Sequence, residues 1–332
     1  EITWIPFAAP IGPIAVSADT AVVAEGRRIR RLALDGAGNA REVEVLDLAM
    51  TATALALGEG RLWVGTYDGL YVASLDGSPL ALVDVGLDAQ TPPRVLALFA
   101  AGHLAYVATA DGQLHVVDAS DMAAPRSLAS LNLAPGSVDE ILGHGTRIVA
   151  RRALGFEVID VADPTHPILL GTYQDDRVSP SSGLATDGRT VWGQGDGTTL
   201  LAYDISDPET GFPVSEQSLG FFARALTWHD GVLFASGRDG RLTAFDTAIH
   251  GRVREVGSMT LPIDGENLRV HGETLVATHR RGGAVVLPAP EIGTPIEPTA
   301  APPTAEPTAV PTEPPAAPRY ELFLPNLHGA DG

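Results

Sequence analysis

The sequence predicts an all-β fold, a seven-bladed β-propeller of four-stranded antiparallel blades. Glycines recur every 42 or 43 residues, and each is followed by a short apolar run that usually ends at an aspartate. A repeat of this length that holds four short strands has the size of a propeller blade, and seven such blades close a ring. The seven glycines are Gly26, Gly69, Gly112, Gly155, Gly197, Gly240 and Gly283.

A second series of glycines marks another turn in the repeats, in stretches such as ATDGRT and WHDGVL. Asp-Gly between apolar runs indicates a hairpin, because these residues tolerate positive φ. The third repeat therefore predicts strands at 94–100, 103–109, 113–118 and 126–133. The second series comprises Gly60, Gly102, Gly145, Gly188, Gly231 and Gly272.

The seventh repeat lacks an outer strand. It predicts only three strands, at 266–271, 274–279 and 284–287, whereas the stretch ITWIPF at 2–7 precedes the first inner strand. We expect residues 1–8 to complete blade seven and close the ring, because pairing the two ends removes an unpaired sheet edge. The propeller would then span residues 1–288. The predicted ring-closure residues are Ile2, Trp4, Ile5 and Phe7.

Three segments after the third strand of a repeat resemble the LVIVD family. They read VVDASDMAAPRSLASLNL, VIDVADPTHPILLGTYQ and AYDISDPETGFPVSEQSLG, in repeats three, four and five. The resemblance implies a β-propeller of the kind found on secreted or surface proteins of bacteria and archaea. It also implies that Asp163-Pro164 and Asp207-Pro208 form turns, in which aspartate caps the backbone and proline fixes φ.

Composition excludes several classes of function. The net charge of −19 argues against nucleic-acid binding, which needs a basic surface. Cysteine and lysine are both absent, which excludes thiolate, Schiff-base and P-loop chemistry. No run of about 18 apolar residues predicts a transmembrane helix. No catalytic motif is present, so we predict that the protein is not an enzyme and has no cofactor or metal site.

Two sets of polar residues are expected at the two ends of the central channel. His103, His144, His229 and His271 lie near the first turn of their repeats, where a ring of histidines would bind a metal or an anion, or simply face water. The opposite mouth holds residues that begin the inner strands, where mixed charges would bind a polar ligand or pair with one another. These candidate ligand residues are Arg94, Asp139, Glu140, Arg224 and Glu266.

The chain ends in a segment of different composition. Residues 289–318 form a linker rich in Pro, Thr and Ala that cannot bury a core. A short apolar stretch at 319–327 alternates like a β-strand, and 328–332 follow it. This strand would pair in cis, anchor the chain to the envelope, or add to a neighbouring subunit. The residues expected to dock are Tyr320, Leu322, Phe323, Leu324 and Pro325.

The function that these patterns favour is an extracellular structural or adhesive propeller. Docking of the C-terminal strand on a neighbour would build a head-to-tail fibre, because such a contact propagates. The alternatives are a monomeric ligand-binding propeller tethered to the cell envelope and, third, a glycan-acting hydrolase. The expected partners are copies of the same chain and a cell-surface glycan or envelope component.

Overall fold

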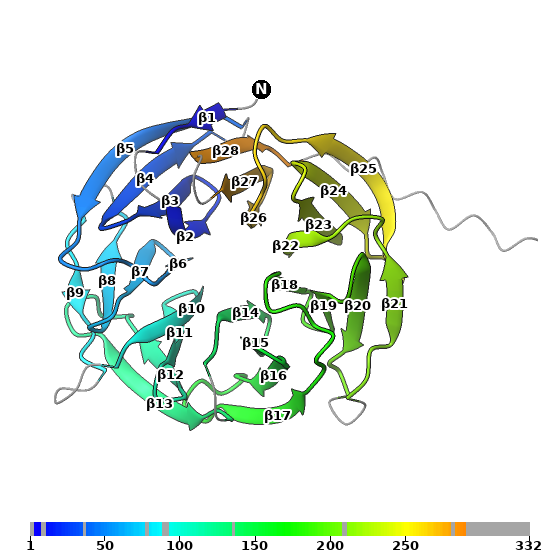
Figure 1. Cartoon of the computed structure of the whole chain (residues 1–332). Coiled ribbons are helices and arrows are strands. Elements are labelled where there is room, and N and C mark those ends of the chain that lie inside the picture. Colours follow the sequence, from blue (N-terminus) through cyan, green and yellow to red (C-terminus); the bar gives the residue numbers. More distant parts are fainter. Residues whose placement is uncertain are drawn as a thin grey trace, which may run out of the picture. The chain divides into compact units, whose positions relative to one another are not determined.

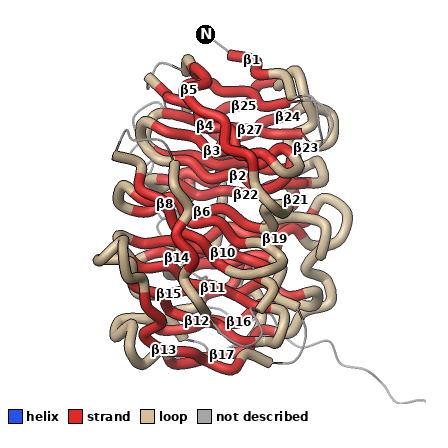
Figure 2. Tube along the Cα trace, turned by 90° about the vertical axis from the view of Figure 1, so that its left-hand side faces the viewer, coloured by secondary structure: helices blue, strands red, loops and turns tan. Residues whose placement is uncertain are grey.

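A computed structural model describes residues 3–7, 11–35, 38–76, 80–87, 93–134, 137–207, 211–279 and 283–289. These residues form seven four-stranded antiparallel sheets arranged around a central channel, as Figure 1 shows. The expected seven-bladed propeller is confirmed. Strands and loops make up the whole described part (Figure 2), and it holds no helix suited to crossing a membrane. The propeller lies in a compact unit of Glu1–Ile292.

Blades one to three follow one another along the chain, each with its strands in order from the channel outwards. Blade one holds β2 (Ile11–Val16), β3 (Thr20–Glu25), β4 (Arg28–Leu34) and β5 (Ala40–Asp47). Blade two holds β6 (Ala54–Gly58), β7 (Arg61–Gly65), β8 (Leu70–Ser74) and β9 (Val83–Asp84). Blade three holds β10 (Val95–Ala101), β11 (Leu104–Thr109), β12 (Gln113–Asp118) and β13 (Arg126–Asn132).

Blades four to six repeat this order. Blade four holds β14 (Glu140–His144), β15 (Arg147–Arg152), β16 (Gly155–Asp160) and β17 (Ile168–Tyr173). Blade five holds β18 (Leu184–Thr186), β19 (Thr190–Gln194), β20 (Thr199–Asp204) and β21 (Ser215–Ser218). Blade six holds β22 (Ala223–His229), β23 (Val232–Gly237), β24 (Arg241–Asp246) and β25 (Arg254–Thr260).

Blade seven joins the two ends of the ring. Counted outwards from the channel, its first three strands are β26 (Asn267–His271), β27 (Thr274–His279) and β28 (Gly283–Pro288). Its outer strand is β1 (Thr3–Ile5). Trp4 pairs with Val285 and Ile5 with Ala284, which confirms the expected closure. The strand is shorter than the predicted 2–7, and Ile2 lies outside the described residues.

The glycine pattern has a direct structural reason. All seven glycines of the first series have positive φ, from 59° at Gly197 to 146° at Gly69. At Gly283, where φ is 133°, a Cβ would also lie 2.5 Å from the carbonyl oxygen of Ile5. Only glycine suits this position, because a side chain would meet both the unfavourable φ and the closing strand.

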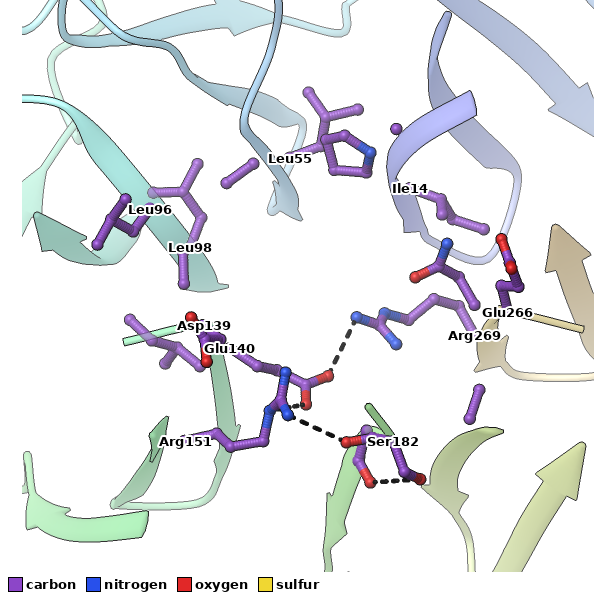
Figure 3. A pocket seen from close by; sticks show the side chains of 18 of the residues that line it. Ile14, Leu55, Leu96, Leu98, Asp139, Glu140, Arg151, Ser182, Glu266 and Arg269 are labelled. Atoms are coloured by element: carbon purple, nitrogen blue, oxygen red, sulfur yellow. Dashed lines mark hydrogen bonds and ion pairs between the residues drawn. The ribbon is translucent and has the colours of Figure 1, made fainter. Parts of the chain in front are cut away.

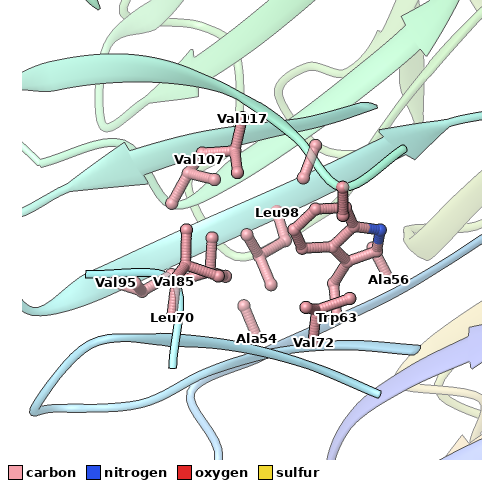
Figure 4. Packing of buried hydrophobic residues seen from close by; sticks show 12 residues of the cluster. Ala54, Ala56, Trp63, Leu70, Val72, Val85, Val95, Leu98, Val107 and Val117 are labelled. Atoms are coloured by element: carbon pink, nitrogen blue, oxygen red, sulfur yellow. The ribbon is translucent and has the colours of Figure 1, made fainter. Parts of the chain in front are cut away.

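Apolar side chains pack between neighbouring blades. One such core joins blades two and three, where Trp63 lies fully buried among Ala56, Val72 and Leu98 (Figure 4). The closing strand takes part in another, since Ile5 is buried beside Val286 and Leu32. Phe7 extends this contact, and the Arg30 guanidinium lies 4.3 Å above its ring. The inner strands are thereby fixed around the channel.

Candidate ligand site at the channel mouth

A cavity of about 630 Å³ opens where the inner strands begin. Ligand pockets commonly have volumes of a few hundred to about a thousand Å³. Every blade contributes to the wall, because equivalent positions of the repeat meet around the channel. One lining residue from each blade in turn is Ile14, Leu55, Leu98, Glu140, Ser182, Arg224 and Arg269.

The cavity has a charged side and a side backed by the cores between blades. Ile14, Leu55 and Leu98 of blades one to three line it (Figure 3), but they are only 5%, 7% and 8% exposed. The ionisable side chains come from blades four, six and seven and are Asp139, Glu140, Arg151, Arg224, Glu266 and Arg269. Three arginines thus face three carboxylates, although the chain as a whole has a net charge of −19. The accessible part of the mouth is therefore mainly polar.

Glu140 is the centre of the charged side. It begins β14 and stands opposite Arg151 in the register of β14 and β15. Its Oε2 lies 3.4 Å from Arg151 Nε and accepts a 3.1 Å hydrogen bond from the backbone N–H of Leu184. Both side chains are largely buried, at 14% and 12% exposed. Arg151 and Leu184 therefore satisfy Glu140 from two adjacent blades.

Backbone contacts hold this wall together. Arg151 Nη1 donates to the carbonyl oxygens of Pro180 at 2.9 Å and Ser182 at 3.1 Å. The Ser182 hydroxyl donates in turn to the carbonyl oxygen of Ala223 at 2.7 Å. Arg151 and Ser182 are consequently structural as well as cavity-lining residues.

Arg269 crosses the channel. It projects from blade seven, and its Nη2 lies 3.6 Å from Oε1 of Glu140 in blade four (Figure 3). Its Nη1 donates to the carbonyl oxygen of Leu268 at 2.9 Å. Beside it, Arg224 Nη2 lies 3.2 Å from Glu266 Oε1. The Arg269 and Arg224 side chains are 36% and 27% exposed, so both reach solvent within the mouth.

A second cavity of about 220 Å³ lies deeper in the channel. Its wall is mainly aliphatic and aromatic, with Phe99 and Trp228 among its residues. Ile14, Leu55, Leu98 and Arg269 line both cavities. The Arg269–Glu140 pair therefore lies where the two cavities adjoin.

Four of the five predicted mouth residues line the main cavity, namely Asp139, Glu140, Arg224 and Glu266. Arg94 does not. It lies with Asp139 in a neighbouring hollow of about 310 Å³, and its guanidinium lies 4.3 Å above the Tyr67 ring. Arg151 and Arg269 were not predicted, since neither begins an inner strand. A search of the second strand opposite Glu140 would have found Arg151.

The histidines separate rather than form a ring. The ring centroids of His229 and His271 lie 6.1 Å apart, whereas His144 packs edge-on against Trp228 at 5.2 Å. His103 instead approaches Asp118, with Nε2 3.9 Å from Oδ1. His271 is exposed at the end of its strand, yet partial loss of water around its ring lowers its pKa and the neighbouring His229 lowers it further. The described residues contain no group of three or more His, Asp or Glu side chains arranged for a metal ion.

The Asp-Pro segment at 163–164 has the expected turn geometry. Asp163 Oδ1 accepts hydrogen bonds from the backbone N–H of Thr165 at 2.9 Å and from its hydroxyl at 2.6 Å. Pro208 of the second such segment lies outside the described residues. So do the predicted docking residues Tyr320, Leu322, Phe323, Leu324 and Pro325.

Residues 97–132 and 148–175 match the family model of the LVIVD repeat. They lie in blades three and four, which confirms the resemblance expected there. The segment of blade five that resembles the repeat is not among the matched residues.

Solved structures share the fold at low sequence identity. The structure of U3-55K has a TM-score of 0.66 at 11% identity and covers 87% of this chain and 98% of that chain. The RRP9 WD40 repeats give a TM-score of 0.64 at 11% identity and cover 87% of this chain and 99% of that chain. The designed Ika8 protein gives 0.61 at 14% identity, covering 86% and 98%. The comparison with curated proteins gave no match.

Proposed function

We propose that this LVIVD-repeat propeller is a non-enzymatic binding protein that acts outside the cell or on its surface. Its recognition site is the mouth of the central channel. The observation that carries the proposal is the convergence of Glu140, Arg224 and Arg269 from three blades on one cavity of about 630 Å³. The fold supplies a rigid frame, since each side chain sits on an inner strand packed between neighbouring blades.

The lining of the cavity favours binding over catalysis. No histidine is among its described lining residues. The Ser182 hydroxyl is engaged by a backbone carbonyl, so it lacks the adjacent base that activates a nucleophile. Arginines lie beside Glu140 and Glu266, which suits recognition of a polar ligand. We therefore expect no turnover of a bound ligand, a glycan included.

The test is a binding screen of the full chain against anionic, cationic and neutral amphiphiles and envelope oligosaccharides. The double variant Arg224→Gln/Glu266→Gln removes an ion pair of the mouth without changing the net charge. Arg254→Gln/Asp246→Asn is the matched control, because it removes an ion pair of 2.8 Å between β25 and β24 that does not line the mouth. A ligand whose affinity falls at least about tenfold only in the mouth variant supports the proposal. If the two double variants bind every compound alike, the mouth is not the recognition site.

We further propose that the C-terminal strand connects subunits into a fibre. Two observations favour it. The sequence at Tyr320–Pro325 alternates like a strand, and every blade already has four strands, including the outer β1 of blade seven. A docking strand therefore has no missing blade strand to replace in its own ring. It would add to the outer edge of a blade in another copy or bind an envelope component.

This second proposal is tested by comparing the full chain with a version that stops after Pro290. Light scattering and negative-stain microscopy should show fibres or large oligomers for the full chain and single rings for the truncation. Monomers in both samples would contradict the connector role and leave attachment to the envelope as the function of the segment.

A further inference from the structure

We infer that the mouth cavity takes a small amphipathic carboxylate whose apolar tail enters the channel and whose carboxylate replaces Glu140 as the partner of Arg269. The inference rests on the proposed role of the mouth as a binding site and names the class of ligand. Three features carry it: a displaceable arginine, the apolar side chains of the adjoining deeper cavity and the position of the competing carboxylates.

Arg269 is the arginine most easily released to a ligand. Its Nη2 lies 3.6 Å from Glu140, beyond a good hydrogen bond, and its side chain is 36% exposed. Glu140 does not depend on it, because Arg151 and the Leu184 N–H contact the other carboxylate oxygen. When Arg269 turns to a ligand, Glu140 keeps these two partners and is not left as an isolated buried charge.

Arg151 is held much more firmly. It is only 12% exposed and donates to two backbone carbonyls in addition to contacting Glu140. Arg224 lies between these extremes, at 27% exposed and 3.2 Å from Glu266. A ligand carboxylate would therefore meet Arg269 first and Arg224 second. Two guanidinium groups beside one carboxylate give charge-assisted hydrogen bonds, which are stronger than neutral ones.

Apolar side chains are accessible in the deeper cavity of about 220 Å³, which Arg269 lines together with the mouth. Leu57, Phe99, Leu142 and Trp228 are half-buried there, whereas Ile14, Leu55 and Leu98 are at most 8% exposed. An alkyl chain lying here would be removed from water, at roughly 0.8 kcal/mol for each buried CH₂ group. A head group alone would leave this surface unused.

The carboxylates of the mouth would favour a ligand with a cationic head group instead. Asp139 is exposed and would attract an ammonium ion. However, Asp139 also borders the side hollow that holds Arg94, away from the cross-channel pair. Glu266 already faces Arg224, and Glu140 faces Arg151. The displaceable charge next to the apolar side chains of the deeper cavity is thus positive, which decides for an anionic ligand.

The experiment uses three probes with the same tail, namely octanoate, octylammonium and 1-octanol. Each is titrated into the full chain by calorimetry below its aggregation concentration. We expect octanoate to bind at least about tenfold more tightly than either of the others, and Arg269→Gln to lose at least about tenfold of that affinity. Arg254→Gln, which removes an outer-strand arginine, should leave octanoate binding unchanged.

Glu140→Gln provides a test of opposite sign. It weakens the hold on Arg269, so octanoate should bind more tightly than to the unmodified chain. Preferred binding of octylammonium would overturn the anionic assignment while leaving the mouth as a binding site. Equal loss of octanoate binding in Arg269→Gln and Arg254→Gln would overturn the role of Arg269. Failure of all three probes would overturn the amphipathic class, and the oligosaccharides of the wider screen would then decide whether the mouth binds at all.

Discussion

Each end of the channel is built from its own set of equivalent repeat positions, and among the described residues the end where the inner strands begin opens into a cavity with charged lining residues. Near the start of the inner strands, the Glu140 carboxylate lies 3.4 Å from Arg151 and 3.6 Å from Arg269. Where the inner strands end, His103, His144, His229 and His271 take different partners. Repetition of the backbone does not make side chains converge, because length and direction differ at each position.

The difference shows what a propeller needs to form a site. A long side chain of an inner strand can reach across the channel, as Arg269 in the middle of β26 does from blade seven to blade four. The histidine side chains are shorter and remain near their own turns or beside one neighbour. The predictions that follow test whether the two ends differ in energy as well as in geometry.

The largest effect is expected from Glu140→Ala. It removes the carboxylate that faces the largely buried Arg151, and breaking such a pair costs about 3–5 kcal/mol of unfolding free energy. His229→Ala at the other end should cost less than about 1 kcal/mol, the usual range for residues near the surface. Chemical denaturation of both variants measures the contrast. Equal losses would show that the ends are energetically alike.

Arg224→Gln should have a smaller effect. Arg224 and Glu266 are 27% and 22% exposed, and ion pairs in contact with water typically contribute up to about 1 kcal/mol. The unfolding free energy of Arg224→Gln should therefore stay within about 1 kcal/mol of that of the unmodified chain at moderate salt. A loss as large as that of Glu140→Ala would mean that the outer pair, not Glu140, supports the mouth.

The histidine end should show a pH dependence that the mouth variants leave intact. Partial loss of water around its ring and the neighbouring His229 lower the pKa of His271 below its ordinary value of 6.5. The unfolded chain then binds the proton more readily than the folded chain. The contribution of His271 to the free energy of unfolding is therefore complete above the unfolded pKa of 6.5 and is lost as the pH drops toward the lower folded pKa. His271→Gln should flatten the part of the stability profile that lies below this ordinary value, as measured by denaturation at a series of pH values. An unchanged profile would contradict the lowered pKa of this imidazole.

The smallest effect is expected from zinc. His229 and His271 form a pair without a third described ligand in metal-binding geometry, so added Zn²⁺ should not raise the melting temperature. His271→Gln is the control, because zinc that binds weakly elsewhere on the surface would affect this variant and the unmodified chain alike. A zinc-dependent increase that this variant abolishes would show a metal site at the histidine end.

The sequence was sufficient for the ring because its turns demand specific residues. Glycine with positive φ marks the hairpins, and the missing strand of repeat seven pointed to the N-terminus, where Trp4 and Ile5 pair with β28. The observed outer strands are less regular than the repeat suggests, since β9 has only two residues. Edge strands pair on one side only, so their length depends on local loop chemistry.

The mouth was only partly predictable. Asp139, Glu140, Arg224 and Glu266 were found because they precede or begin inner strands, and this position fixes their place around the channel. The same rule misplaced Arg94, since stacking on Tyr67 draws its side chain aside. It also missed Arg269, whose role comes from the reach of a long side chain across the ring. Such contacts depend on three-dimensional distance, which repeat position alone does not give.

The central claim is that the mouth of the channel is the recognition site, and one indole group lies in the deeper cavity that adjoins it. Among the four tryptophans, Trp228 lines the deeper cavity, Trp63 and Trp192 are buried in cores between blades, and Trp4 lies in the closing strand. Nuclear magnetic resonance of the chain labelled with ¹⁵N-tryptophan resolves their indole signals, and Trp228→Phe assigns the relevant one. We predict that octanoate shifts the Trp228 signal in the unmodified chain and not in Arg269→Gln. Saturation of octanoate binding with the Trp228 signal unmoved would contradict the account.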